Sequence, residues 1–109
     1  MKFTKKDERK DYTRMLEGIE RKTLVHGDRT LLAEFRLEKG SLLPEHSHPH
    51  EQTGMLLSGS MRFFVGGMNF LAEPGDSWCI PSEEAHAAEA LEDSTVLEVF
   101  SPCREDYLE

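Results

Sequence analysis

Three of the five histidines of this 109-residue chain fall within five positions, at His46, His48 and His50. In an extended strand, residues two apart project from the same face, so the imidazoles of His46 and His48 can reach one ion. Gln52 has the same parity and would add an amide oxygen. Nitrogen and oxygen ligands of this kind suit a divalent transition metal. The spacing therefore favours a metal site over a polar surface loop.

A fourth ligand can come from His86, which lies far along the chain beyond several turn signals. In a closed antiparallel barrel, such a distant strand can bring a side chain across the interior, although His86 taken alone reads as an ordinary half-buried histidine. We predict that four residues bind the metal: His46, His48, Gln52 and His86. His50 also has the inward parity, but Pro49 and a bulge would break the alternation. We predict that His50 is a non-ligand near the mouth of the cavity.

Short strands must position these side chains. Apolar runs of four to eight residues recur between turns rich in Gly, Pro and Asp, and no segment carries a sustained helical period. This rhythm predicts an all-β fold of antiparallel strands, a sandwich or barrel. Gly59-Ser60 and Gly66-Gly67 suit tight hairpins, because glycine tolerates positive φ. We expect strands over residues 18–25, 30–37, 45–50, 53–57, 61–65, 68–71, 77–80, 85–90 and 95–100.

Composition limits the classes of function. The length suits a single domain, and the formal net charge of −8 argues against nucleic-acid binding, which relies on Lys and Arg. The sequence contains no apolar run long enough for a membrane span, and its polar start lacks the apolar centre of a secretory signal, so we predict a cytoplasmic protein. Cys79 and Cys103 would both be free thiols there.

The two histidine segments resemble the paired motifs of the cupin superfamily. The first motif is Gly, five residues, His-x-His, three or four residues, Glu, six residues and Gly. This chain matches it at Gly40, His46, His48, Gln52 and Gly59, with Gln52 in place of Glu. The substitution exchanges a carboxylate for a neutral carbonyl, which would leave a bound metal more positive and a better Lewis acid.

The second cupin motif is Gly, five residues, Pro-x-Gly, two residues, His, three residues and Asn. Gly75, Pro81 and His86 match it, whereas Glu83 stands where the family has Gly and Ala90 where it has Asn. The resemblance implies an all-β, single-domain cupin, that is, a double-stranded β-helix or jelly-roll barrel. We place this barrel at residues 16–109 and expect residues 1–15 to form an N-terminal arm or a swapped strand.

The end of the chain carries a second group of candidate site residues. Composition alone favours a terminal strand followed by a solvated charge cluster. The whole chain, however, resembles the pectin-degradation cupins of the KdgF type, with a similar His-Ser-His-Pro-His stretch and a similar Phe-Ser-Pro-x-Arg-Glu-Asp close. That resemblance implies that Phe100 and Arg104 bind substrate. It also implies that Arg104 and Glu98 are catalytic, with Glu98 standing where an Asp is expected. Arg104 would pair with a uronate carboxylate, and Glu98 would move a proton.

The KdgF-type resemblance implies a metal-dependent enzyme of uronate metabolism that opens or isomerises cyclic unsaturated or deoxy-keto uronates. The cofactor would be one divalent metal, Zn, Fe, Mn, Ni or Co, with no organic cofactor. Two alternatives remain open: a non-haem iron dioxygenase, and a non-catalytic protein in which the metal anchors a small ligand. We expect a small-molecule partner, no nucleic acid and no membrane. We also expect a homodimer, because a symmetric partner commonly covers an exposed edge strand and a loose arm.

Overall fold

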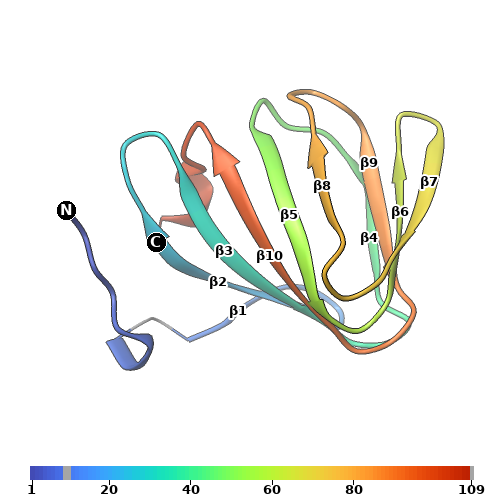
Figure 1. The fold of residues 1–109 in the computed structure, drawn as a ribbon, viewed down its shortest axis with the longest axis horizontal. Helices are drawn as coiled ribbons and strands as arrows, with labels where there is room; N and C mark the ends of the chain where they lie inside the picture. The colour runs from blue at the N-terminus through green and yellow to red at the C-terminus, as the bar shows by residue number, and fades with distance from the viewer. Residues whose placement is uncertain (9–10, 109) are drawn as a thin grey trace.

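The computed structural model describes residues 1–8 and 11–108 and places two antiparallel sheets face to face (Figure 1). One sheet has the order β1-β2-β3-β10-β5-β8 and the other the order β4-β9-β6-β7. The all-β prediction is therefore confirmed. The strands are β1 (Thr13–Leu16), β2 (Ile19–His26), β3 (Leu31–Leu37), β4 (Leu42–His46), β5 (Glu51–Ser58), β6 (Met61–Val65), β7 (Met68–Ala72), β8 (Ser77–Ile80), β9 (His86–Ala90) and β10 (Ser94–Ser101), with short 3-10 turns η1 (Lys6–Glu8) and η2 (Glu105–Tyr107).

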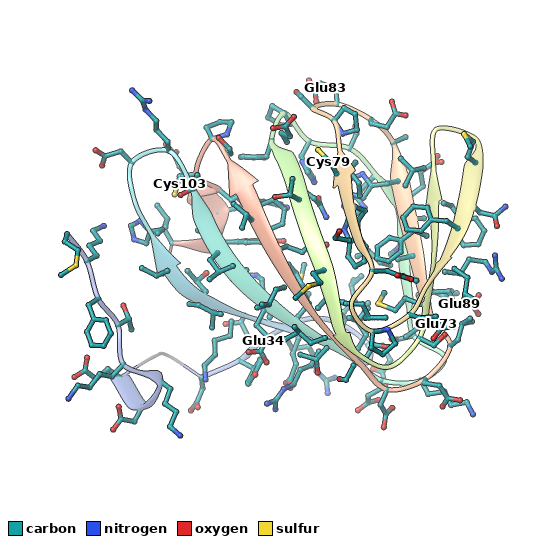
Figure 2. The ribbon with its side chains drawn as sticks, in the orientation of Figure 1. Glu34, Glu73, Cys79, Glu83, Glu89 and Cys103 are labelled. Atoms are coloured by element: carbon teal, nitrogen blue, oxygen red, sulfur yellow. The ribbon has the colours of Figure 1, made fainter. Side chains whose placement is uncertain are left out.

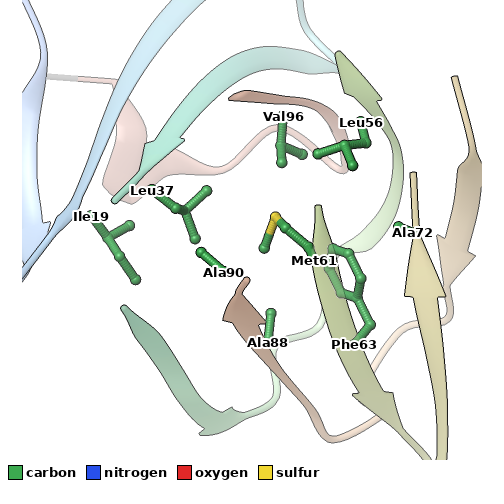
Figure 3. Packing of buried hydrophobic residues seen from close by; sticks show 9 residues of the cluster. All are labelled: Ile19, Leu37, Leu56, Met61, Phe63, Ala72, Ala88, Ala90 and Val96. Carbon is green, nitrogen blue, oxygen red and sulfur yellow. The ribbon is translucent and has the colours of Figure 1, made fainter. Parts of the chain in front are cut away.

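The larger of two buried apolar clusters lies between the two sheets (Figure 3), and a smaller one contains Leu31, Ala33, Phe100 and Tyr107. Leu56 on β5 and Met61 on β6 are almost fully buried, as is Val96 on β10. Alternation explains this arrangement, because every second residue of β10 is buried while its neighbours are half-buried. The core cluster contains Ile19, Leu37, Leu56, Met61, Phe63, Ala72, Ala88, Ala90 and Val96.

Two local predictions are wrong and one is confirmed. The strand predicted over residues 45–50 lies earlier, at Leu42–His46, so His48 belongs to the connection before β5. Gly59-Ser60 does not close a hairpin, because β5 and β6 belong to different sheets. Gly59 has φ 97° and lies against Ser94, so a side chain there would collide where the chain crosses between the sheets. Gly66-Gly67 does close the β6–β7 hairpin, with φ 57° and 81°.

The sequence pattern missed β1, which pairs with β2 of the same chain. Tyr12, just before β1, anchors this segment: its hydroxyl donates to Glu34, and the cationic groups of Lys22 and Arg36 lie over its ring. The first residues extend away from the sheets in Figure 1, and Phe3 is exposed. The boundary predicted after residue 15 stays a prediction.

The two cysteines are free thiols. Figure 2 shows Cys79 on β8 and Cys103 beyond the end of β10, well apart from each other. Within the described residues, no helix is long and apolar enough to span a membrane.

Candidate metal centre

Three histidines converge where the end of β4 meets the start of β9. His46 ends β4, His86 begins β9, and these two residues are paired across the strands. His48 comes from the connection that follows β4. One ring nitrogen of each histidine lies within 4.8 Å of those of the other two. We call His46, His48 and His86 the three-histidine group; its donor atoms are close enough to hold one metal ion.

Backbone carbonyls orient all three rings. Each imidazole donates its Nδ1–H to the carbonyl of a residue two positions away along the chain. The bonds run from His46 to Pro44 (2.9 Å), from His48 to His50 (3.0 Å) and from His86 to Glu84 (2.8 Å). These bonds put the proton on Nδ1 and leave the Nε2 lone pair of each ring available as a ligand.

Two further observations fit a cation at the three-histidine group. The Nε2 atom of His86 is buried with no hydrogen-bond partner in the described part of the chain. The Nε2 atom of His48 lies 3.0 Å from Oε1 of the buried Gln52. With the proton of His48 on Nδ1, both atoms present lone pairs, an arrangement that a cation bound between them would stabilise. The four-ligand set that includes Gln52 stays a prediction, and this geometry agrees with it.

The surroundings of His48 and His86 favour their neutral imidazoles. Burial lowers the pKa of His48 to about 4, helped by the charges of Arg104 and of the other two histidines. Burial also lowers the pKa of His86, although its hydrogen bond to the Glu84 carbonyl opposes this shift. A metal ion would therefore not compete with protons for these nitrogens at neutral pH.

The loop between β8 and β9 holds the segment that carries His48. The Glu83 N–H donates to the His48 carbonyl at 2.8 Å, and the Ser82 hydroxyl donates to the Pro49 carbonyl at 2.7 Å. Glu83, labelled at the tip of this loop in Figure 2, has φ 66°, in the left-handed region. The cupin motif has glycine at this position, and glycine adopts this conformation without a steric penalty. Glu83 departs from the motif at a steric cost of roughly 1 kcal/mol.

A buried carboxyl group lines the same cavity as His46 and His86. Glu98 on β10 is paired with Gly54 on β5, which is paired in turn with Trp78 on β8. The Trp78 Nε1–H donates to Glu98 Oε1 at 3.1 Å, and Oε2 has no partner among the described residues. Burial raises the pKa of Glu98 to about 8, and the hydrogen bond from Trp78 opposes this rise only in part.

Gly54 creates the space for this carboxyl group. A Cβ atom at this position would lie 2.6 Å from both the Glu98 carboxyl carbon and Trp78 Nε1. The sequence analysis did not single out Gly54. The available signal was an isolated glycine inside a strand, which often marks a close approach by another group.

Phe100 and Arg104 complete the site. Phe100 is buried, and its ring contacts that of His48 edge-on at a centroid distance of 5.9 Å. The Arg104 guanidinium lies over the Phe100 ring at 5.0 Å. Segments far apart in the sequence thus line one cavity, whose polar and aromatic walls include His46, Gln52, His86, Glu98, Phe100 and Arg104.

His50 lies outside the three-histidine group. Its ring centroid is 5.4 Å from that of His48, and its Nδ1 atom is buried without a partner in the described part of the chain. His50 contributes its backbone carbonyl, which accepts a hydrogen bond from the His48 ring and orients that ring.

Comparisons with known proteins agree with this geometry. The family profile described as a cupin domain matches residues 33–101. The chain is 28% identical over 104 residues to the pectin degradation protein KdgF of Dickeya dadantii (strain 3937), covering 94% of each. It is also similar to the structure of KdgF from Halomonas sp., with 31% identity, a TM-score of 0.91 and 99% of each chain covered. An RmlC-like cupin from Shewanella frigidimarina, with 24% identity and a TM-score of 0.90 over 97% of this chain and 95% of that one, shares the fold.

Proposed function

The chain belongs to the cupin family, and we propose that it is a metal-dependent enzyme that opens the rings of unsaturated or deoxy-keto uronates. One observation carries the proposal: the buried Glu98 and the cation of Arg104 line a single cavity together with His46 and His86, two members of the three-histidine group. Similarity to KdgF proteins over nearly the whole chain supports pectin-derived uronates as the substrate class.

Ring opening is an internal rearrangement. The bond between the anomeric carbon and the ring oxygen breaks, the anomeric hydroxyl loses its proton, and the ring oxygen gains one. For an unsaturated uronate the product is an enol, which becomes a ketone when a carbon is protonated. No atoms are gained or lost, so the protein must bind, orient and move protons.

The proposed ligands of the metal are His46, His48, His86 and Gln52. A bound divalent metal would supply Lewis acidity toward the oxygens of the sugar. The carbonyl hydrogen bonds that fix the histidine rings prepare the Nε2 atoms before any metal arrives, which lowers the cost of ordering the site. The neutral Gln52 balances less of the metal charge than a glutamate would.

Glu98 is proposed to move the proton. It lines the cavity, and its Oε2 atom has no partner among the described residues, so we assign to this oxygen the proton exchange with a bound substrate. Its other oxygen is held by Trp78, which fixes the orientation of the carboxyl group. A buried carboxyl group with one fixed and one unpaired oxygen suits general acid–base catalysis.

Arg104 is proposed to bind the uronate carboxylate, and Phe100 to form the wall beneath the sugar. A guanidinium group offers parallel N–H donors that match the two oxygens of a carboxylate. Arg104 is mostly buried, at 15% side-chain exposure, which strengthens its attraction for an anion relative to a solvated arginine.

We also propose a cytoplasmic homodimer of this cupin. The support is the N-terminal segment, which extends from the sheets and leaves Phe3 72% exposed. A clean monomer in size-exclusion chromatography combined with light scattering would contradict the dimer.

The enzyme proposal is tested by following unsaturated galacturonate monomer with the metal-loaded protein. Loss of ultraviolet absorbance and appearance of the open-chain product by NMR should exceed the spontaneous rate, stop with chelator and resume with added metal. Oxygen uptake, measured in the same reaction, separates ring opening from a dioxygenase. No acceleration by a fully loaded protein would contradict the proposal.

A further inference from the structure

Arg104 is held along one edge of its guanidinium group. The Asp106 carboxylate accepts hydrogen bonds from Arg104 Nε at 3.1 Å and from Nη2 at 2.8 Å. This bidentate contact occupies the side edge of the planar group. The end edge, made of Nη1 and the second Nη2 hydrogen, still offers two parallel donors, which is the arrangement that a second carboxylate requires.

The flat face of the Arg104 guanidinium is held as well. Its central carbon lies 4.0 Å from the centroid of the Tyr107 ring, and the central carbon of Arg21 lies at the same distance. Two guanidinium groups cannot both occupy the centre of one ring face at this distance, so they lie on opposite faces. Tyr107 is therefore sandwiched between two cations.

Strand β2 fastens the turn that carries these contacts. The Thr23 hydroxyl donates to the Tyr107 carbonyl at 2.8 Å, and Arg21 Nη2 donates to the Asp106 carbonyl at 3.4 Å. The Tyr107 ring is 5% exposed and packs edge-on against Phe100, with an interplanar angle of 89°. The turn η2 is thus a fixed part of the cavity end, not a solvated tail.

We propose that Asp106 and Tyr107 are positioning residues that fix Arg104 so that its end edge can bind the substrate carboxylate. The inference rests on the proposed function, which makes that substrate a uronate. Orientation, not charge, is the contribution of Asp106, because its negative charge by itself weakens the attraction of Arg104 for a second anion. If Asp106 acts by orienting Arg104, its removal weakens binding of the substrate carboxylate. If its negative charge dominated, its removal would strengthen that binding.

The test measures binding of D-galacturonate and D-galactose to metal-loaded protein by isothermal titration or NMR. We expect Asp106→Ala and Tyr107→Leu to weaken galacturonate binding about tenfold and to leave galactose binding unchanged, since one fixed charge-assisted contact is worth about this much. Tyr107→Phe, which keeps the ring, and Glu105→Ala, which removes a neighbouring exposed charge, should stay within about twofold of the wild type.

The outcomes separate this inference from the proposed function. A wild type without preference for galacturonate over galactose would contradict the uronate function and the positioning role with it. A wild-type preference that survives in both Asp106→Ala and Tyr107→Leu would overturn the positioning role alone. Tighter galacturonate binding by Asp106→Ala would mean that Asp106 competes with the ligand, which also overturns it. Asp106 is 58% exposed, so its variant decides the matter even if Tyr107→Leu fails to fold.

Discussion

The same strands build two regions of opposite character at the two ends of the sandwich. On β10, Val96 belongs to the core cluster and forms an apolar part of the cavity wall, whereas Glu98, two residues later, brings a buried carboxyl group to the same cavity. On β5, Leu56 is core and Gln52 is site. The buried side-chain atoms without partners, within the described residues, all lie at the site end, on His50, His86 and Glu98. Buried polar atoms without partners are costly, and among the described residues they gather at the end that carries the three-histidine group.

The largest expected effect comes from removing a metal ligand. His86→Ala should lower metal affinity more than about 100-fold, since even residues that only support ligands cost 10–100-fold. Because His86 brings a buried nitrogen without a partner, its loss should not unfold the protein. Elemental analysis and circular dichroism test both points, with His26→Ala, outside the three-histidine group, as the control. Full metal content in His86→Ala would mean that the ligands are misassigned.

Truncating a core side chain should lower the stability of the protein and leave its metal binding unchanged. Leu56 is fully buried, so Leu56→Ala should lower the free energy of unfolding by about 3 kcal/mol through lost burial and a cavity. Metal stoichiometry should stay as in the wild type. Urea denaturation in chelator, together with metal analysis, measures both quantities. A large loss of metal from this variant would show that the two ends are not separable.

Neutralising the buried carboxyl group should raise the stability of the protein and lower its activity. Glu98→Gln keeps the shape of the side chain and the oxygen that accepts from Trp78, but it removes the cost of burying an ionisable group. We expect the metal-free variant to gain on the order of 1–2 kcal/mol in unfolding free energy and to lose turnover of unsaturated galacturonate. Glu73→Gln, an exposed glutamate in Figure 2, is the matched control and should change neither. A destabilised Glu98→Gln would contradict this account of the site end.

The smallest expected effect concerns backbone strain at the site end. Glu83→Gly should stabilise the protein by roughly 0.5–1 kcal/mol, because glycine adopts φ 66° without the steric cost of a side chain. Glu84→Gly, at a position without positive φ, should destabilise it. Thermal melts of the two variants decide whether the signs differ. Destabilisation by both substitutions would mean that the Glu83 side chain contributes more than its strain costs.

The sequence spacing predicts the three histidines that the structure brings together, but not their local structure. The parity argument placed His46 and His48 on one strand, yet β4 ends at His46 and the His48 ring is aimed by a carbonyl hydrogen bond. Hydrogen bonds of this kind leave no mark in a hydrophobic pattern. The strands themselves were largely predictable, because alternation and glycine turns are local signals.

The remaining site contacts depend on strand register, which sequence periodicity does not fix. Gly54 matters only because β10 and β8 place Glu98 and Trp78 on either side of it. Similarly, composition favoured a solvated cluster after β10, but Tyr107 is buried because β2 holds its carbonyl and Arg104 covers its ring. The hydrogen bonds from Trp78 to Glu98 and from Thr23 to Tyr107 each join residues at least 20 positions apart, so they depend on the tertiary structure. The contact between Arg104 and Tyr107, by contrast, lies within the last turn.

The most direct test of the central claim is a calorimetric titration of chelator-stripped protein with Zn²⁺ or Ni²⁺, followed by a thermal melt of the loaded protein. The account predicts one ion bound per chain, a higher melting temperature on loading, and loss of both effects in His48→Ala. A wild type that binds no metal at the three-histidine group, or whose His48→Ala variant binds it equally well, would contradict the claim that the polar end of the sandwich is a metal centre.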